Sequence, residues 1–166
     1  MDNWKQNNAG IYIPKNEILH PVGAVELVAR DAITKHVVDI VKVKNLFVTV
    51  GKAGLADLFR GNTAGNRGQP TYQAIGTSST APAAGDTQLT AEGFRKLISI
   101  RSASANVASF QTFFDTSEGN IVIAEAGLFG DNATGTANSG VLYCHALLSF
   151  TKTSSVTLTI TWTVTF

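Results

Sequence analysis

Few residues of this chain combine the chemical groups and the spacing that catalysis or metal binding requires. The three histidines, His20, His36 and His145, are far apart, and none has a carboxylate beside it in a ligand pattern. Adjacent strand residues point to opposite faces, so His145 and its neighbour Cys144 cannot easily chelate one ion. Cys144 is the single cysteine and lies in an apolar run, which predicts a buried, unreactive thiol. We therefore expect no metal site and no cofactor.

Two further segments match binding motifs only in part. Gly51 and Lys52 could end a phosphate-binding loop, but Leu46 and Ala53 stand where that pattern requires a Gly and a Ser or Thr. Residues 115–120 offer oxygen atoms for calcium but lack the ligand spacing of an EF-hand loop. An ordinary surface turn is the better interpretation of that segment.

Carboxylates of the second half of the chain are the remaining candidates for catalysis. A glycoside hydrolase would need two of them at a working distance in a cleft. Glu125 lies in an apolar strand, where it must face solvent or find a hydrogen-bond donor. We expect it on an open face of the sheet, paired with a lysine or arginine, because no nucleophile or partner acid is evident. The enzyme hypothesis, which would draw on Asp115, Glu118, Glu125 and Asp131, is therefore the least favoured, and we expect no enzymatic activity.

The composition bounds the class of protein. The 166 residues suit one domain, and 15% of them are charged, against about 25% in typical soluble proteins. A net charge of +1 argues against a nucleic-acid binder that depends on phosphate contacts. Neither a signal peptide nor an apolar run of the ~18–20 residues of a membrane span is visible. We expect a protein made in a cytoplasm that binds neither nucleic acid nor membrane, with a surface partly covered by other subunits.

Alternating apolar residues predict a mainly β protein. The clearest strand is 155–166, where apolar residues alternate with threonines to the last position. One short helix is expected at 50–59, with Leu55, Leu58 and Phe59 on one face and Gly61 in its stop signal. Eight strands at this spacing predict a jelly-roll-like β-sandwich. The other seven strands are expected at 22–30, 36–44, 71–76, 94–103, 106–116, 121–129 and 140–150.

Residues 1–20 predict an extended N-terminal arm, followed by a β-sandwich domain at 21–166. The arm has no helical period, and its large apolar residues are scattered. A terminal segment of this kind either folds back over its own domain or lies on a neighbouring subunit. We expect the arm to bind a partner subunit through Trp4, Ile11, Tyr12, Ile13, Ile18 and Leu19.

A series of short motifs resembles the small, β-rich virion proteins of long-tailed bacteriophages. The similarity covers roughly residues 22–166 and supplies no catalytic residues. It implies a non-enzymatic component of the particle, either a head decoration (cement) protein or a protein attached to tail fibres or baseplates. The motifs are NLFV at 45–48, YQAIGTSSTAP at 72–82, DTQL at 86–89, FRK at 94–96, EAGLFG at 125–130 and LSFTKTSS at 148–155.

Two functions follow from this resemblance as expectations. The first is capsid decoration: a homo-oligomer, a trimer by analogy with the family, binds the major capsid protein on the outer face of the head. It would stabilise the head through inter-subunit β-contacts summed over many copies. The alternative is a tail-fibre or baseplate component, whose loops 77–87 and 130–139 contact the host. Either function places the protein in the virion.

Overall fold

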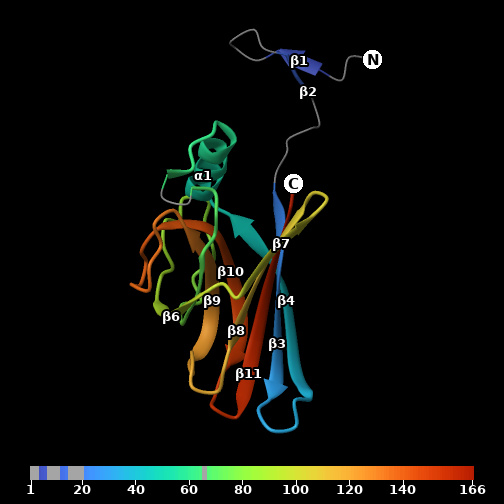
Figure 1. The fold of residues 1–166 in the computed structure, drawn as a ribbon, viewed down its shortest axis with the longest axis vertical. Coiled ribbons are helices and arrows are strands. Elements are labelled where there is room, and N and C mark those ends of the chain that lie inside the picture. Colours follow the sequence, from blue (N-terminus) through green and yellow to red (C-terminus); the bar gives the residue numbers. More distant parts are fainter. Residues whose placement is uncertain (1–3, 7–11, 15–20, 65–66) are drawn as a thin grey trace.

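The computed structural model describes residues 4–6, 12–14, 21–64 and 67–166, and these form a mainly β protein with one short helix (Figure 1). Two strands pair with each other, and nine form one antiparallel sheet in the order β6-β5-β9-β10-β4-β3-β11-β8-β7. The strands are β1 (Trp4–Gln6), β2 (Tyr12–Pro14), β3 (Val22–Asp31), β4 (Val37–Phe47), β5 (Tyr72–Gly76), β6 (Glu92–Leu97), β7 (Ile100–Ser104), β8 (Val107–Phe114), β9 (Val122–Gly130), β10 (Val141–Thr151) and β11 (Val156–Thr165), and the helix is α1 (Thr49–Phe59).

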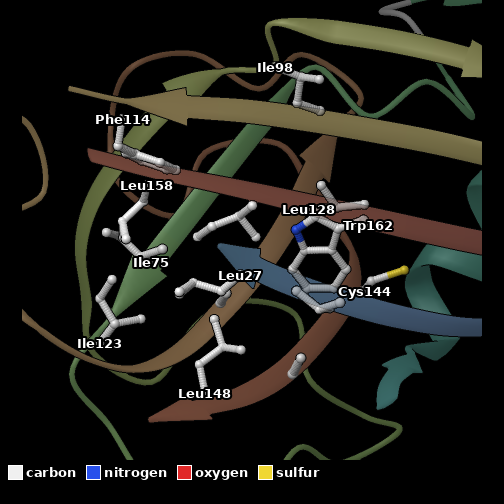
Figure 2. Packing of buried hydrophobic residues seen from close by; sticks show 14 of the residues in the cluster. Leu27, Ile75, Ile98, Phe114, Ile123, Leu128, Cys144, Leu148, Leu158 and Trp162 are labelled. Atoms are coloured by element: carbon white, nitrogen blue, oxygen red, sulfur yellow. The ribbon is translucent and has the colours of Figure 1, made fainter. Parts of the chain in front are cut away.

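The nine-stranded sheet curls, so that its two halves face each other across the main core. We call β4, β3, β11, β8 and β7 layer I, and β6, β5, β9 and β10 layer II. The two layers join through a short pairing of β10 with β4, at Cys144 opposite Phe47 and His145 opposite Leu46. Inward-facing residues of both layers form one buried apolar cluster, which includes Leu27, Ile75, Leu128, Leu158 and Trp162 (Figure 2).

The strand predicted at 155–166 is confirmed and occupies a central position. Strand β11 pairs with β3 on one side and with β8 on the other. Its apolar residues Leu158, Ile160, Trp162 and Val164 are buried in the core, as the alternation predicts. The intervening threonines therefore lie on the outer face of layer I.

The predicted strand at 94–103 is wrong in one respect, because the chain forms two strands there. Strand β6 ends at Leu97 and β7 begins at Ile100, and the two lie at opposite edges of the sheet. Ile98 donates its backbone N–H to Thr71 next to β5, at 2.9 Å, whereas Ser99 donates to Gln111 of β8, at 2.8 Å. The chain therefore crosses from layer II to layer I between these two residues.

Helix α1 lies at one end of the sheet and contacts β10 (Figure 1). The predicted apolar face of this helix is wrong at Phe59, which is 97% exposed. Two glycines of the helix lie against Tyr143 of β10 instead: an added Cβ would lie 2.6 Å from its Cα at Gly51 and 2.3 Å from its hydroxyl oxygen at Gly54. The predicted stop is confirmed: Gly61 has a φ of +87° and donates its N–H to the carbonyl of Leu58 at 2.9 Å. No helix in the described ranges is long and apolar enough to cross a membrane.

The predicted arm is described only in part. Strands β1 and β2 pair antiparallel, with Trp4 opposite Pro14 and Gln6 opposite Tyr12. Of the proposed partner-binding residues, only the backbone pairing of Trp4, Tyr12 and Ile13 is described, and Ile11, Ile18 and Leu19 lie outside the described residues. The binding of a partner by the arm stays a prediction.

Candidate functional site

A cluster of a buried histidine, a buried glutamate and a partly exposed aspartate lies on the outer face of layer II. Register places His145 of β10 opposite Gly127 of β9, on the same face as Glu125. His145 Nε2 lies 3.1 Å from Glu125 Oε2, and His145 Nδ1 lies 2.8 Å from Asp86 Oδ2. Both ring nitrogens thus face carboxylates, which leaves neither free to activate a nucleophile.

This cluster fastens the loop 77–91 to the sheet. The backbone N–H groups of Thr90 and Ala91 donate to the two carboxylate oxygens of Glu125, at 3.0 and 2.6 Å. The expectation for Glu125 is therefore wrong: its side chain is fully buried, and it contacts a histidine and two amides instead of a lysine or arginine. The reason is that the loop, distant in sequence, folds back over this face. The same loop brings Asp86 to His145, a contact that no spacing in the sequence indicates.

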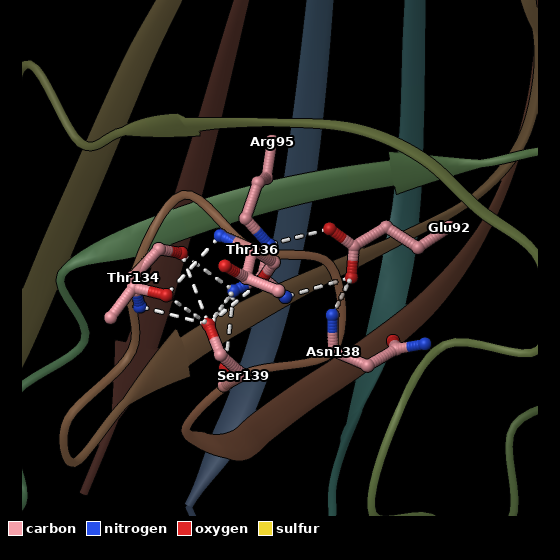
Figure 3. A network of polar contacts seen from close by, with 6 residues as sticks. All are labelled: Glu92, Arg95, Thr134, Thr136, Asn138 and Ser139. Carbon is pink, nitrogen blue, oxygen red and sulfur yellow. Dashed lines mark hydrogen bonds and ion pairs between the residues drawn. The ribbon is translucent and has the colours of Figure 1, made fainter.

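A second cluster fastens the loop 131–139 (Figure 3). Arg95 and Glu92 form a two-point ion pair, with N–O distances of 2.5 and 2.7 Å, and their side chains are 3% and 1% exposed. Arg95 also donates to the backbone carbonyls of Thr134 and Ser139, while Glu92 accepts the N–H of Asn138 at 2.9 Å. Both members of the pair therefore also form hydrogen bonds with the loop.

A third cluster holds the segment before β5. The Tyr143 hydroxyl donates to Asp131 Oδ1 at 2.7 Å and accepts the backbone N–H of Gly68 at 2.7 Å. Burial and the hydrogen bond to Asp131 raise the pKa of Tyr143 above its ordinary value. The tyrosine is thus a neutral cross-link between strand and loop.

The other predicted carboxylates lie in a turn beside two lysines. Glu118 pairs with Lys96, and its carboxylate accepts the backbone N–H of Asp115 at 3.0 Å. Buried Lys152 donates to the Asp115 carbonyl at 2.6 Å and to Asn120 Oδ1 at 2.9 Å, and burial lowers its pKa. The four candidate carboxylates therefore belong to three separate hydrogen-bonded clusters.

The predicted thiol burial at Cys144 is confirmed. Its side chain is fully buried, and burial raises its pKa well above the ordinary value. Within the ranges that the structure describes, no group of three or more His, Cys, Asp or Glu side chains could hold a metal ion.

The two fastened loops and the start of α1 together cover the outer face of layer II. Leu89 of the first loop and Ala133 of the second belong to one apolar cluster on this face, with Phe129 and Leu142 of the sheet. Thr49, at the start of α1, donates its N–H to the carbonyl of Ala84 in the first loop at 2.8 Å. The three polar clusters and this second apolar cluster give a rigid covering.

No family model, curated protein or solved structure matches this chain. The function is therefore inferred from the geometry of its surfaces. Two surfaces are candidates for binding: the rigid loop covering of layer II and the outer face of layer I.

The outer face of layer I carries an apolar row across four strands. The pairings β4–β3, β3–β11 and β11–β8 place Ile40, Val28, Thr159 and Phe113 side by side. Ile40 is 50% exposed and Phe113 is 45% exposed. The sequence alone does not predict this row. Ile40 and Phe113 lie on different strands, and only the three strand pairings together show that they belong to one row.

A second apolar surface lies at the end of the sheet beside α1. It is a groove of about 630 Å³, lined by Pro21, Phe166 and helix residues that include Lys52, Leu55 and Phe59. The strongly exposed Phe59 therefore forms one wall of a groove.

Proposed function

We propose that this chain is a non-enzymatic structural component of a bacteriophage particle, a decoration protein on the outer face of the head. It binds there as a homo-oligomer against the major capsid protein. The motifs that resemble phage virion proteins support this proposal, and so does the low charge content of 15%. We propose a jelly-roll-like β-sandwich as the finer description of its curled sheet.

The observation that carries the proposal is the open outer face of layer I. A protein that works alone in water gains little from a row of large apolar side chains on a broad sheet face, whereas a subunit of an assembly buries them. Ile40 and Phe113 are half exposed in the isolated chain, and Val28 and Thr159 lie between them in the row. Such a face suits contact between subunits.

The polar clusters support a structural function by the way their hydrogen bonds are used. His145 and Glu125 contact each other and the loop 77–91, and the Arg95–Glu92 pair contacts the loop 131–139. Their bonding stiffens the molecule, which is what a particle component under mechanical load requires.

The alternative is a tail-fibre or baseplate component, and one observation favours it. Loops 77–91 and 131–139 meet in one apolar cluster and are held by buried polar groups, so they present a preorganised surface. Preorganisation lowers the entropic cost of binding a host ligand. The two proposals differ in the place of the protein on the virion.

The N-terminal arm is proposed to attach the subunit to its neighbours. Deleting residues 1–20 is expected to leave the melting temperature of the isolated protein nearly unchanged and to weaken its binding to undecorated heads strongly. Differential scanning calorimetry and co-sedimentation measure the two effects. A large fall in melting temperature would show that the arm belongs to the core of its own domain.

Co-sedimentation also tests the proposed function. The purified chain is mixed with undecorated heads of the phage that encodes it, and separately with purified tails. Saturable binding to heads alone supports decoration. Binding to tails alone would refute it and favour the alternative.

A further inference from the structure

A buried lysine side chain meets a side-chain amide just after the end of β10. Lys152 is 2% exposed, and its Nζ lies 2.9 Å from Oδ1 of Asn120, in the turn between β8 and β9. The backbone holds the two residues together, because the N–H of Lys152 donates to the carbonyl of Ile121 at 3.0 Å. A lysine amine is a nucleophile toward carbonyl carbons, so this contact brings together two groups that can react.

The amide of Asn120 is held in one orientation. Its Nδ2 donates to the carbonyl of Thr116 at 2.9 Å, so its Oδ1 faces Lys152. The carbon of a carbonyl lies about 1.2 Å from its oxygen, so the amine is already near the separation of about 3–3.5 Å from which a nucleophile attacks. Asn120 itself is exposed, which gives a leaving group a path to solvent.

Only a neutral amine is a nucleophile, and the surroundings of Lys152 favour that form. Burial lowers its pKa, and this effect outweighs the opposing effect of the carboxylates of Asp115 and Glu118. A neutral amine keeps two N–H donors, and two backbone carbonyls can accept them, those of Asp115 at 2.6 Å and Thr153 at 3.5 Å. The lone pair of the nitrogen is then left for the amide of Asn120.

We propose that Lys152 and Asn120 join in an intramolecular isopeptide bond. The Nζ atom of Lys152 attacks Cγ of Asn120, a bond forms between these two atoms, and the bond from Cγ to Nδ2 breaks. One proton passes from the attacking amine to the leaving nitrogen, which departs as ammonia. The reaction is an exchange of one amide for another, so it needs no oxidant, reductant or cofactor.

The bond closes a covalent loop that contains β9 and β10 and ties the end of β10 to the turn that joins the two layers. A cross-link that closes a long loop lowers the entropy of the unfolded chain, as a disulfide does, and so stabilises the folded one. The inference goes beyond the proposed function and does not depend on it. A cross-linked chain that binds no heads would refute decoration and leave this inference intact.

Mass spectrometry of the full chain, kept folded and then denatured for the measurement, tests the proposal. The natural chain should be lighter than its sequence by the mass of one ammonia molecule. Lys152→Arg keeps the positive charge but cannot form the bond, and Asn120→Ala lacks the amide, so both variants should have the full mass of their sequences. Asn106→Ala is the matched control. The Nδ2 of Asn106 also donates to a backbone carbonyl, that of Phe166 at 2.9 Å, and this variant should still lose ammonia.

A tryptic digest of the natural chain identifies the two residues that are joined. Trypsin does not cleave after an acylated lysine, so one branched peptide should contain both Asn120 and Lys152. This peptide decides the question even if a variant does not fold, which circular dichroism checks. A natural chain with the full mass of its sequence would overturn the inference. An ammonia loss that persists in Lys152→Arg would also overturn it, because a cyclic imide at a single asparagine causes the same change in mass.

Discussion

Replacing Glu92 tests how much the buried Arg95–Glu92 ion pair contributes to the free energy of unfolding. Glu92→Leu leaves the guanidinium of Arg95 without its carboxylate in a site where both side chains are almost fully buried. Breaking a buried pair from one side costs ~3–5 kcal/mol, because an uncompensated charge remains. The N–H of Asn138 also loses its acceptor, which adds to the cost.

Urea unfolding followed by fluorescence measures this loss as a change in the free energy of unfolding. The double variant Glu92→Leu with Arg95→Met leaves no buried charge and should be less destabilised than Glu92→Leu alone. Arg60→Gln is the control, because Arg60 pairs with Asp57 at 2.7 Å with its side chain 68% exposed, and exposed pairs contribute less than about 1 kcal/mol. A cost for Glu92→Leu no larger than that of Arg60→Gln would refute the reasoning.

Three further predictions follow from single contacts. Trp162→Ala should lower the free energy of unfolding by ~3–5 kcal/mol in urea titration, since Trp162 is fully buried in the central strand, and a loss below ~1 kcal/mol would contradict its place in the core. Gly51→Ala should increase hydrogen exchange in α1, because its Cβ would meet the backbone of Tyr143. Gly85→Ala is the control, since open space surrounds Gly85, and it should leave the exchange in α1 unchanged. Equal exchange in the two variants would contradict the close packing. Hydrogen bonds from the turn after β3 lower the pKa of Asp31, so its stabilising effect is complete above its ordinary pKa and is lost as pH falls through the lower folded value. Asp31→Asn should therefore lose less stability than the natural chain on acidification, and identical acid-unfolding curves would contradict this.

The sequence predicts the strands well, because a strand that is buried on one face has an apolar residue at every second position. The alternation around Trp162 identifies β11, and its central place follows from a fully apolar inner face. The break between β6 and β7 could not be predicted, since 94–103 is compatible with one strand, and only the partners of Ile98 and Ser99 show the crossing.

The candidate site was much less predictable than the fold. Asp86 meets His145 only because the loop 77–91 returns over layer II, and no local pattern encodes that path. One signal was present: if β9 and β10 form a hairpin, Glu125 and His145 can lie on the same face. A buried carboxylate needs a hydrogen-bond partner, and a histidine on the adjacent strand can supply one where the register of the two strands brings them together.

The central claim, that this chain belongs to the head of a phage particle, is tested most directly by locating the protein. Cryo-electron microscopy of intact virions, compared with virions that lack this protein, locates the missing density. The account predicts density repeated over the outer surface of the head, into which the curled sheet fits with the outer face of layer I against a neighbouring subunit. Density confined to the tail, or no difference between the two particles, would contradict it.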